Sequence, residues 1–436
     1  MKIFLNLTLL TFFLLAGCSE QSPQKNSSQT EATEPLKELG QLQPKQLRDA
    51  STIRVLDEIP EHIGKIEDLS VFQADSNAPY SSQLVPEGSN GKTGEYFLTK
   101  IEGLTVDEKG RVIVVNRGTN YASEVHVFNK DGTYLTPLGR SGRGPGEYIE
   151  PFFLQSNAGK VYLYDVTGKR LNVYSADDFS FMKSSLEERW DIRDQKEIKG
   201  FNFGGFKVRV DGNILAEFYK SNFNKVTSRS KSTYLLMDID GNKLDFEPFT
   251  FSGNLRIVTE DNYPFPNVFP IGRTLTAMSN EGELFVANTQ EFLIKKYDPT
   301  GAYQSAIYYP IKGAPLDFEK FLKSGRKFGP SIPPVVEVEK AFNAVGEELP
   351  KTTPVIDKLI VDDKNRIWVA VPIGTKSDIY EWWILAETGE LLTKVVLPLE
   401  QPILDIKDDF LFSKMTDKET GAEYVVKYRL DLTENK

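Results

Sequence analysis

The chain has 436 residues, a formal net charge of −10, 40% hydrophobic residues, one cysteine and two histidines. This acidic balance argues against nucleic acid as a partner and against docking on anionic lipid headgroups. The single cysteine excludes a disulfide within the chain. The two histidines exclude a zinc site of several histidines and any His-Glu-x-x-His helix, and they leave few options for a Ser-His-Asp triad.

The first eighteen residues predict a secretory signal that ends at a modified cysteine. Lys2 precedes an apolar run over 3–15, and small residues follow before Cys18. The run is shorter than the about twenty apolar residues that a membrane-spanning helix needs. The segment Leu15-Ala-Gly-Cys18 resembles the lipobox of bacterial lipoproteins. An ordinary signal peptide with a cysteine near the cut, or a buried core cysteine, is the alternative interpretation.

The lipobox resemblance implies that residues 1–17 are removed and that Cys18 is acylated. Several acyl chains hold a protein stably on a membrane, whereas one chain holds it only marginally. Ser19 is not the Asp that resembles an inner-membrane retention signal, so we expect a bacterial cell-envelope protein with the outer membrane favoured over the inner membrane. Residues 18–50 are polar and contain few large apolar side chains, which predicts a flexible tether.

From residue 51 onward, the pattern changes to short strands. The clearest unit consists of two apolar segments that flank Asp107-Glu-Lys-Gly110. Asp and Gly at these positions predict a tight turn, because Asp bonds nearby amides and Gly adopts positive φ. The strand-like segments 124–128 and 133–135 follow, so the sequence predicts a meander of four strands.

Similar units return near residues 160, 206, 277, 359 and 403. Repeated four-stranded meanders are typical of a β-propeller, so we predict an all-β, six-bladed propeller over residues 51–436. Five or seven blades stay open because the units drift in length, and two β-sandwiches are the alternative fold. We expect an N-terminal strand, either 51–56 or 66–72, to close the ring by completing the sixth blade.

The segment from about 310 to 354 interrupts the repeat. Apolar residues three to four apart in 316–322 and 335–345 predict two short helices. An insertion between two blades either caps one mouth of the central channel or covers an apolar patch on the surface.

A glycine-rich stretch runs from Leu138 to Tyr148 and is followed by Pro151. Together with the preceding Val-Phe-x-x-Asp-Gly phrase and the lipobox, it resembles an uncharacterised family of six-bladed propeller lipoproteins of Bacteroidetes-like bacteria, similar to NHL-repeat propellers. The resemblance covers most of 51–436 and implies the fold. That family has no assigned activity, so the resemblance implies no catalytic residue. Two units depart from the pattern: one lacks an Asp before Gly159, and the last lacks a clear Gly turn.

The glycine-rich stretch also invites a phosphate-binding interpretation. It lacks the Lys-Ser/Thr ending of a P-loop and no helical pattern follows, so a connection between blades is the favoured interpretation. If the stretch does bind a ligand, Arg140 and Arg143 are the candidates to hold a carboxylate or phosphate.

Three consecutive carboxylate pairs, 177–178, 362–363 and 408–409, lie at predicted turns. Neighbours in a strand point to opposite faces, so structural roles are favoured over catalysis. A glycosidase pair or a calcium site assembled from different blades stays open. No cofactor is predicted, and calcium has no further support in the sequence.

Aromatic residues form two groups. Trp368, Trp382 and Trp383 occur in the fifth unit, where packing between blades is favoured over a ligand surface. Tyr263 and Phe265 alternate with prolines, a pattern that suits an exposed rigid loop and makes them candidate ligand contacts.

The sequence therefore predicts a lipid-anchored, non-enzymatic propeller that binds a ligand, an envelope protein or a glycan. The alternative is a propeller-type enzyme, such as a metal-dependent lactonase, a lyase or a glycan-acting hydrolase. A third hypothesis is a structural subunit of an envelope assembly. None of these hypotheses has a candidate catalytic residue in the sequence.

Overall fold

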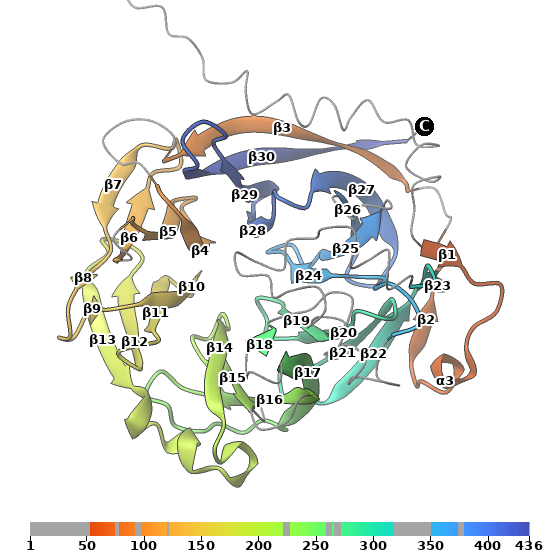
Figure 1. The fold of residues 1–436 in the computed structure, drawn as a ribbon, viewed down its shortest axis with the longest axis horizontal. Helices are drawn as coiled ribbons and strands as arrows, with labels where there is room; N and C mark the ends of the chain where they lie inside the picture. The colour runs from red at the N-terminus through yellow and green to blue at the C-terminus, as the bar shows by residue number, and fades with distance from the viewer. Residues whose placement is uncertain are drawn as a thin grey trace, which may run out of the picture.

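The computed structural model describes residues 53–74, 78–91, 98–119, 122–220, 227–258, 264–265, 272–316, 350–373 and 379–435, with side chains left out at 227–229, 254–258 and 264–265. In this part of the chain, six sheets of four or five strands surround a common axis (Figure 1). The prediction of an all-β, six-bladed propeller is confirmed.

Each blade is a meander whose first strand lies nearest the axis. Blades one to three contain β4 (Ile101–Val106), β5 (Val112–Arg117), β6 (Ser123–Phe128), β7 (Tyr134–Pro137); β10 (Pro151–Asn157), β11 (Lys160–Asp165), β12 (Arg170–Ser175), β13 (Phe181–Leu186); and β14 (Asn202–Val208), β15 (Ile214–Lys220), β16 (Thr227–Met237), β17 (Phe249–Val258), β18 (Pro264–Phe265).

Blades four to six contain β19 (Thr274–Met278), β20 (Leu284–Asn288), β21 (Leu293–Tyr297), β22 (Tyr303–Tyr308), β2 (Leu69–Val71); β24 (Lys358–Val361), β25 (Ile367–Ile373), β26 (Ile379–Leu385), β27 (Leu391–Pro398); and β28 (Ile403–Lys407), β29 (Phe410–Thr416), β30 (Glu423–Glu434), β3 (Tyr80–Asn90). Two further strand pairs lie between blades: β1 (Ile53–Val55) with β23 (Ile311–Gly313), and β8 (Arg140–Ser141) with β9 (Glu147–Tyr148).

The ring is closed by an N-terminal strand, but not by either predicted segment. Strand β3 pairs antiparallel with β30 from Tyr80 opposite Glu434 to Asn90 opposite Val425, which completes blade six (Figure 1). The prediction that 51–56 or 66–72 closes the ring is wrong. The sequence hides β3 because Pro86 and Gly88 resemble a turn. In an outermost strand a proline is tolerated, and the register shifts between these two residues.

The two predicted closing segments lie on the outside of blade four instead. Strand β1 pairs with β23, and β2 adds to β22 in parallel. Between them, helix α3 (Glu61–Gly64) buries Ile63, and Phe72 stacks on Tyr309 with ring centroids 5.5 Å apart. These contacts fix the N-terminal segment before the chain reaches blade six.

Helix is scarce in the described residues. Besides α3, three short 3₁₀ turns follow blade two: η1 (Glu187–Arg189), η2 (Asp191–Asp194) and η3 (Lys196–Ile198). No described helix is long and apolar enough to cross a membrane. Two helices were predicted within the 310–354 insertion, at 316–322 and 335–345. Except for residue 316, both lie outside the described residues. An isolated β-bridge between Pro315 and Thr352 joins the two ends of the insertion.

The core lies between neighbouring blades. Trp383 belongs to the cluster that joins blades four and five, while Trp368 and Trp382 belong to the cluster that joins blades five and six. All three are at most 1% exposed, so the packing interpretation of these tryptophans is confirmed. Large flat side chains suit this position because each blade presents two apolar faces that only its neighbours can cover.

The first turn of each blade explains why the Asp-x-x-Gly pattern recurs and why two units lack it. In blade one, the Asp107 carboxylate accepts hydrogen bonds from the amides of Lys109 and Arg111 at 2.9 and 2.8 Å, and Gly110 has a φ of 75°. The unit that lacks the Asp uses a tighter turn with Ala158 and Gly159 at positive φ, and the last unit places Asp408 and Asp409 there. Shorter turns of this kind need no Asp cap.

Candidate functional site

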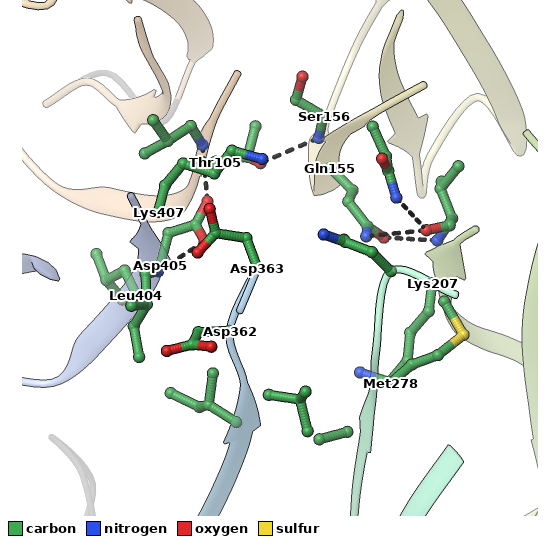
Figure 2. Close-up of a pocket in the computed structure, with 18 of the residues that line it drawn as sticks. Thr105, Gln155, Ser156, Lys207, Met278, Asp362, Asp363, Leu404, Asp405 and Lys407 are labelled. Atoms are coloured by element: carbon green, nitrogen blue, oxygen red, sulfur yellow. Dashed lines mark hydrogen bonds between the residues drawn. The ribbon is translucent and has the colours of Figure 1, made fainter. Parts of the chain in front are cut away.

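A cavity of about 290 Å³ lies on the propeller axis. It is lined by the last residues of β4, β10, β14, β19, β24 and β28 and by the turns that follow them, so every blade contributes one inner strand. The site therefore collects side chains that are far apart in the sequence, and it lies at the end of the axis where the inner strands finish. Figure 2 shows its labelled residues.

One wall of the cavity carries two carboxylates, Asp363 after β24 and Asp405 in β28, which lie side by side in Figure 2. Asp405 accepts hydrogen bonds from the amides of Val106 at 2.7 Å and Ile406 at 2.8 Å. Burial raises the pKa of Asp405 to about 6 against the opposing effect of these amides. Because Val106 belongs to blade one, Asp405 also ties the sixth blade to the first.

Asp363 is less completely satisfied. Its Oδ2 accepts a hydrogen bond from the Asp408 amide at 3.0 Å, while its buried Oδ1 has no hydrogen-bond partner among the described residues. Burial raises the pKa of the Asp363 carboxyl, and the nearby Lys407 ammonium acts in the opposite direction. An unpaired oxygen at such a position is costly, because a buried acceptor without a donor loses its water without replacement.

Lys207 in β14 enters the cavity from the opposite wall, near Met278 (Figure 2). Its neighbours Phe206 and Val208 pack between blades two and three, and alternation along the strand turns Lys207 to the other face. No described residue forms a hydrogen bond or ion pair with its ammonium group. Burial lowers the pKa of Lys207, and the Glu217 carboxylate partly opposes that shift.

Lys407 of β28 also lines the cavity, on the same wall as Asp405, and other polar groups of the lining hold neighbouring inner strands together. Gln155 accepts a hydrogen bond from the Val208 amide at 2.8 Å, and Asn157 donates one to the Val208 carbonyl at 2.9 Å. The Ser156 amide donates to the Thr105 hydroxyl at 3.0 Å. The wall is thus cross-linked by polar contacts between blades, so the charged groups stand on a rigid frame.

The glycine-rich stretch connects blade one to blade two, away from this cavity. The Arg140 guanidinium is 81% exposed and pairs with Glu147 at 2.7 Å, while Glu147 also accepts a hydrogen bond from the Gly144 amide at 2.7 Å. Arg143 is exposed, and its carbonyl accepts a hydrogen bond from Arg170 at 2.9 Å. The structure does not bring these arginines to the axial site, and their ligand role stays a prediction.

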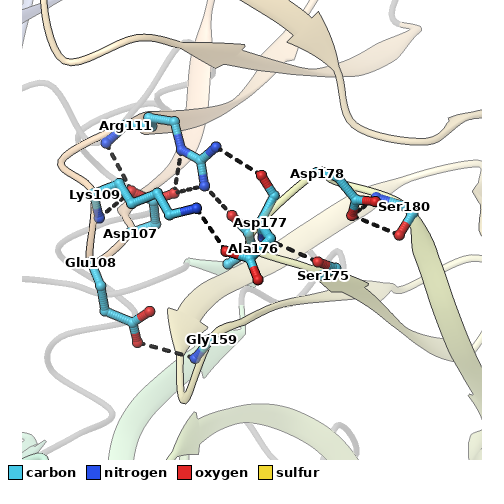
Figure 3. Close-up of polar contacts among 10 residues, drawn as sticks. All are labelled: Asp107, Glu108, Lys109, Arg111, Gly159, Ser175, Ala176, Asp177, Asp178 and Ser180. Carbon is cyan, nitrogen blue, oxygen red and sulfur yellow. Dashed lines mark hydrogen bonds and ion pairs between the residues drawn. The ribbon is translucent and has the colours of Figure 1, made fainter.

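The carboxylate pairs lie at turns, as predicted. Asp177 and Asp178 follow β12, where Asp177 pairs with Lys109 of blade one at 2.7 Å (Figure 3). Arg111 from the same blade-one turn donates hydrogen bonds to the carbonyls of Ala176 and Asp177 and stacks 4.3 Å from the centre of the Phe179 ring. This group is a latch between blades one and two.

A second latch of the same design joins blades five and six. Asp362 accepts hydrogen bonds from the amide of Arg366 at 2.9 Å, from its guanidinium at 2.6 Å and from the Trp368 indole at 2.8 Å. Arg366 and Lys364 then reach Asp409 of blade six. Asp362 and Asp409 therefore belong to the latch, whereas Asp363 lines the cavity and accepts a hydrogen bond from the Asp408 amide, an arrangement that sequence alone did not reveal.

Several predictions remain untested by the structure. Cys18 and Tyr263 lie outside the described residues, and Phe265 is described only as part of β18, without its side chain. Within the described ranges, no group of three or more His, Cys, Asp or Glu residues is placed to hold a metal ion.

Lys207 and Asp405 were not predicted as site residues from the sequence, and Asp363 was expected only as a turn residue. A signal was present, because Lys207 and Asp405 are charged residues within inner strands and Asp363 lies in the turn that follows another inner strand. Their mutual approach depends on the closed ring, which adjacency along the chain does not indicate.

One match to a protein-family model supports the fold. The model of a family described as a 6-bladed beta-propeller (DUF5128) matches residues 92–265, and no curated protein matches. A Bacteroides fragilis protein named for its expected export is similar over 83% of this chain and 99% of its own, with 14% identity and a TM-score of 0.47. A member of the DUF4221 family from Bacteroides vulgatus shares 9% identity over 82% of this chain and 100% of its own, with a TM-score of 0.45.

A third solved structure, the PQQ-bound aldose sugar dehydrogenase of Streptomyces coelicolor, shares 14% identity over 81% of this chain and 100% of its own, with a TM-score of 0.40. The chain is thus a six-bladed propeller matched in part by a family model that names a fold and no activity.

Proposed function

We propose that this chain is a lipid-anchored binding protein of the bacterial cell envelope, and that its axial cavity receives a small polar ligand. One observation carries the binding proposal. The cavity keeps charged side chains from different blades, Lys207 on one wall and Asp363 on the other, that are not fully paired within the described protein. Small-molecule sites typically combine a pre-formed concave space with a few such polar groups.

The proposed location rests on the sequence. The lipobox-like segment that ends at Cys18 and the polar stretch over 18–50 support a membrane anchor followed by a tether, with the outer membrane favoured. An envelope protein or a glycan that binds elsewhere on the propeller remains part of this proposal. We also propose that the chain is related to the NHL-repeat-like propeller lipoproteins that its sequence resembles.

Binding is tested with the purified full chain in detergent, by thermal shift against sugars, amino acids, short peptides and small anions, followed by calorimetric titration of any hit. The matched variant is Met278→Trp, which places a bulky ring in the cavity. We expect a hit with the natural sequence and its loss in Met278→Trp. A hit that survives in a folded Met278→Trp protein would place the ligand elsewhere.

The anchor is tested by fractionating cells that express either the natural sequence or Cys18→Ser. We expect the natural chain in the membrane fraction, with the mass of its N-terminal peptide increased by the acyl groups. Cys18→Ser should leave the membrane fraction. Equal membrane association of the two chains would contradict lipid anchoring.

A propeller-type enzyme is the second candidate, favoured by the neighbouring carboxyls of Asp363 and Asp405 with raised pKa. Acid and base pairs of enzymes often show such shifts. However, Asp405 already accepts hydrogen bonds from two backbone amides, that of Val106 in blade one and that of Ile406 in its own strand, so Asp363 is the freer group. Turnover of lactones or glycans that disappears in Asp363→Asn would support the enzyme. Calcium removal with a chelator would show whether such turnover needs the metal.

A further inference from the structure

We propose that the ligand of the axial cavity is a small zwitterion, with its ammonium group at the Asp363 wall and its carboxylate at the Lys207 wall. This inference rests on the proposed function, because it names the ligand class for the same cavity. An amino acid or a dipeptide has this chemistry.

Opposite charges lie on opposite walls of the cavity. Asp363 and Asp405 occupy the wall formed by blades five and six, where their two carboxylates outnumber the single ammonium of Lys407, whereas Lys207 comes from blade three (Figure 2). Lys207 forms no ion pair with either carboxylate. Opposite charges across one cavity that do not meet leave a space that a molecule with two charged ends can span.

Leaving these groups without partners is costly. Asp363 Oδ1 is buried without a donor among the described residues, and a charged group without a partner costs stability that an apolar residue of similar size would not. Lys207 lies in a strand whose neighbours are Phe206 and Val208, so a lysine is not required there for packing. A ligand carboxylate would relieve the desolvation of Lys207, and a ligand ammonium would donate to the carboxylates opposite.

Ligands with a single charge, or with none, match the two walls less well than a zwitterion does. A cation without an anionic group would meet the ammonium of Lys207 in the same space. An anion without a cationic group would meet two carboxylates, Asp363 and Asp405, on the wall where Lys407 is the one cation among the described lining residues. A neutral sugar would leave both walls without a charged partner. At about 290 Å³, the cavity is at the small end of ligand sites, which suits an amino acid or dipeptide better than a long peptide.

The experiment is a calorimetric titration of the full chain with probes of increasing charge separation: glycine, 4-aminobutyrate, 6-aminohexanoate and dialanine. Each probe is paired with its N-acetylated form and with its C-terminal amide, which remove one charge each. We expect at least one zwitterion to bind, and both of its capped forms to bind at least about tenfold more weakly, because a charge-assisted hydrogen bond contributes at least that much.

Variants assign the two walls. Lys207→Met should abolish the preference for a free carboxylate over its amide, and Asp363→Asn should abolish the preference for a free amine over its acetylated form. Lys418→Met and Asp245→Asn, at exposed positions, are the matched controls and should keep both preferences. A merely structural role of Lys207 would weaken all probes equally and leave the preference for a free carboxylate intact.

The outcomes separate the two proposals. If no zwitterion binds while sugars, anions or cations bind in the cavity, the zwitterion inference is overturned and the proposed function stands. If no probe of any class binds, both fail. If a zwitterion binds but its capped forms bind equally well, the charged walls do not recognise it and the inference is again overturned.

Discussion

Two aspartates only four residues apart in blade six experience opposite environments. Asp409 lies in the latch to blade five, where burial acts to raise its pKa but the hydrogen bond from Lys364 and the charge of Arg366 hold the pKa below its usual value. Asp405 lies at the axial cavity, where burial raises the pKa to about 6. No described cation forms an ion pair with Asp405.

The same contrast separates the latches from the cavity as a whole. The latch residues Asp362 and Arg366 are 0% and 11% exposed, and Asp362 accepts hydrogen bonds at both oxygens. Lys207 in the cavity has no hydrogen-bond or ion-pair partner among the described residues. Paired charges at blade contacts serve the fold. Unpaired charges on the cavity wall reduce the stability of the fold, so their presence indicates a functional role.

The largest expected effect comes from removing a paired charge in the latch between blades five and six. Asp362→Ala leaves the guanidinium of Arg366 and the indole of Trp368 without their buried acceptor. We expect the free energy of unfolding to fall by about 3–5 kcal/mol, the usual cost of breaking a buried pair. Urea titration measures this fall, with Asp245→Ala at an exposed position as the control. A fall no larger than that of the control would show that the latch does not hold the blades.

A pH titration sharpens the contrast between the two aspartates. The pKa of Asp405 in the fold, about 6, lies above its ordinary value, so the folded state binds the proton more tightly than the unfolded chain does. This contribution to stability is present at pH 4 and is lost as the pH rises through about 6. From pH 7 to pH 4, the natural chain should gain about 2–3 kcal/mol relative to Asp405→Asn, at about 1.4 kcal/mol per unit of pKa.

Urea unfolding of both proteins at pH 4, 5, 6 and 7 measures this difference. Parallel pH profiles would contradict a raised pKa of Asp405. Asp409→Asn provides the opposite control, because its lowered pKa predicts a contribution that is lost as the pH falls below about 4.

The smallest expected effect concerns an exposed pair. Arg140→Met removes the partner of Glu147 at the surface, where solvent screens the attraction. We expect a change in melting temperature close to the error of the measurement, and no change in ligand binding at the axis. Loss of binding in this variant would restore the glycine-rich stretch as a ligand site.

The fold was largely predictable because its signals are local. Each Asp-x-x-Gly turn between apolar segments marks a blade, since a tight turn needs an Asp cap and a residue with positive φ. Strand β3 was missed for an equally local reason: Pro86 and Gly88 have the chemistry of a turn but lie in an edge strand with an irregular register. The strand that closes the ring is the one that pairs with the free edge of the last blade. That edge exists only in the folded ring, so a local sequence pattern does not identify the strand.

The cavity was not predictable in the same way. Lys207, Asp363 and Asp405 come from blades three, five and six, and they meet only when the ring has closed. In the sequence, Asp363 is the second member of a turn pair, and nothing there distinguishes it from Asp362. Their contacts separate them: Asp362 accepts the hydrogen bonds of the latch, whereas Asp363 has a buried oxygen that no described donor reaches.

The most direct test is the stability of Lys207→Met, measured by urea unfolding beside Arg366→Met in the absence of ligand. Both variants replace a long cation with an apolar side chain, one in the cavity and one in the latch. We predict opposite signs: Arg366→Met less stable than the natural chain, and Lys207→Met as stable or more stable by about 1 kcal/mol. A loss of stability in Lys207→Met as large as that in Arg366→Met would contradict the account, because Lys207 would then serve the fold.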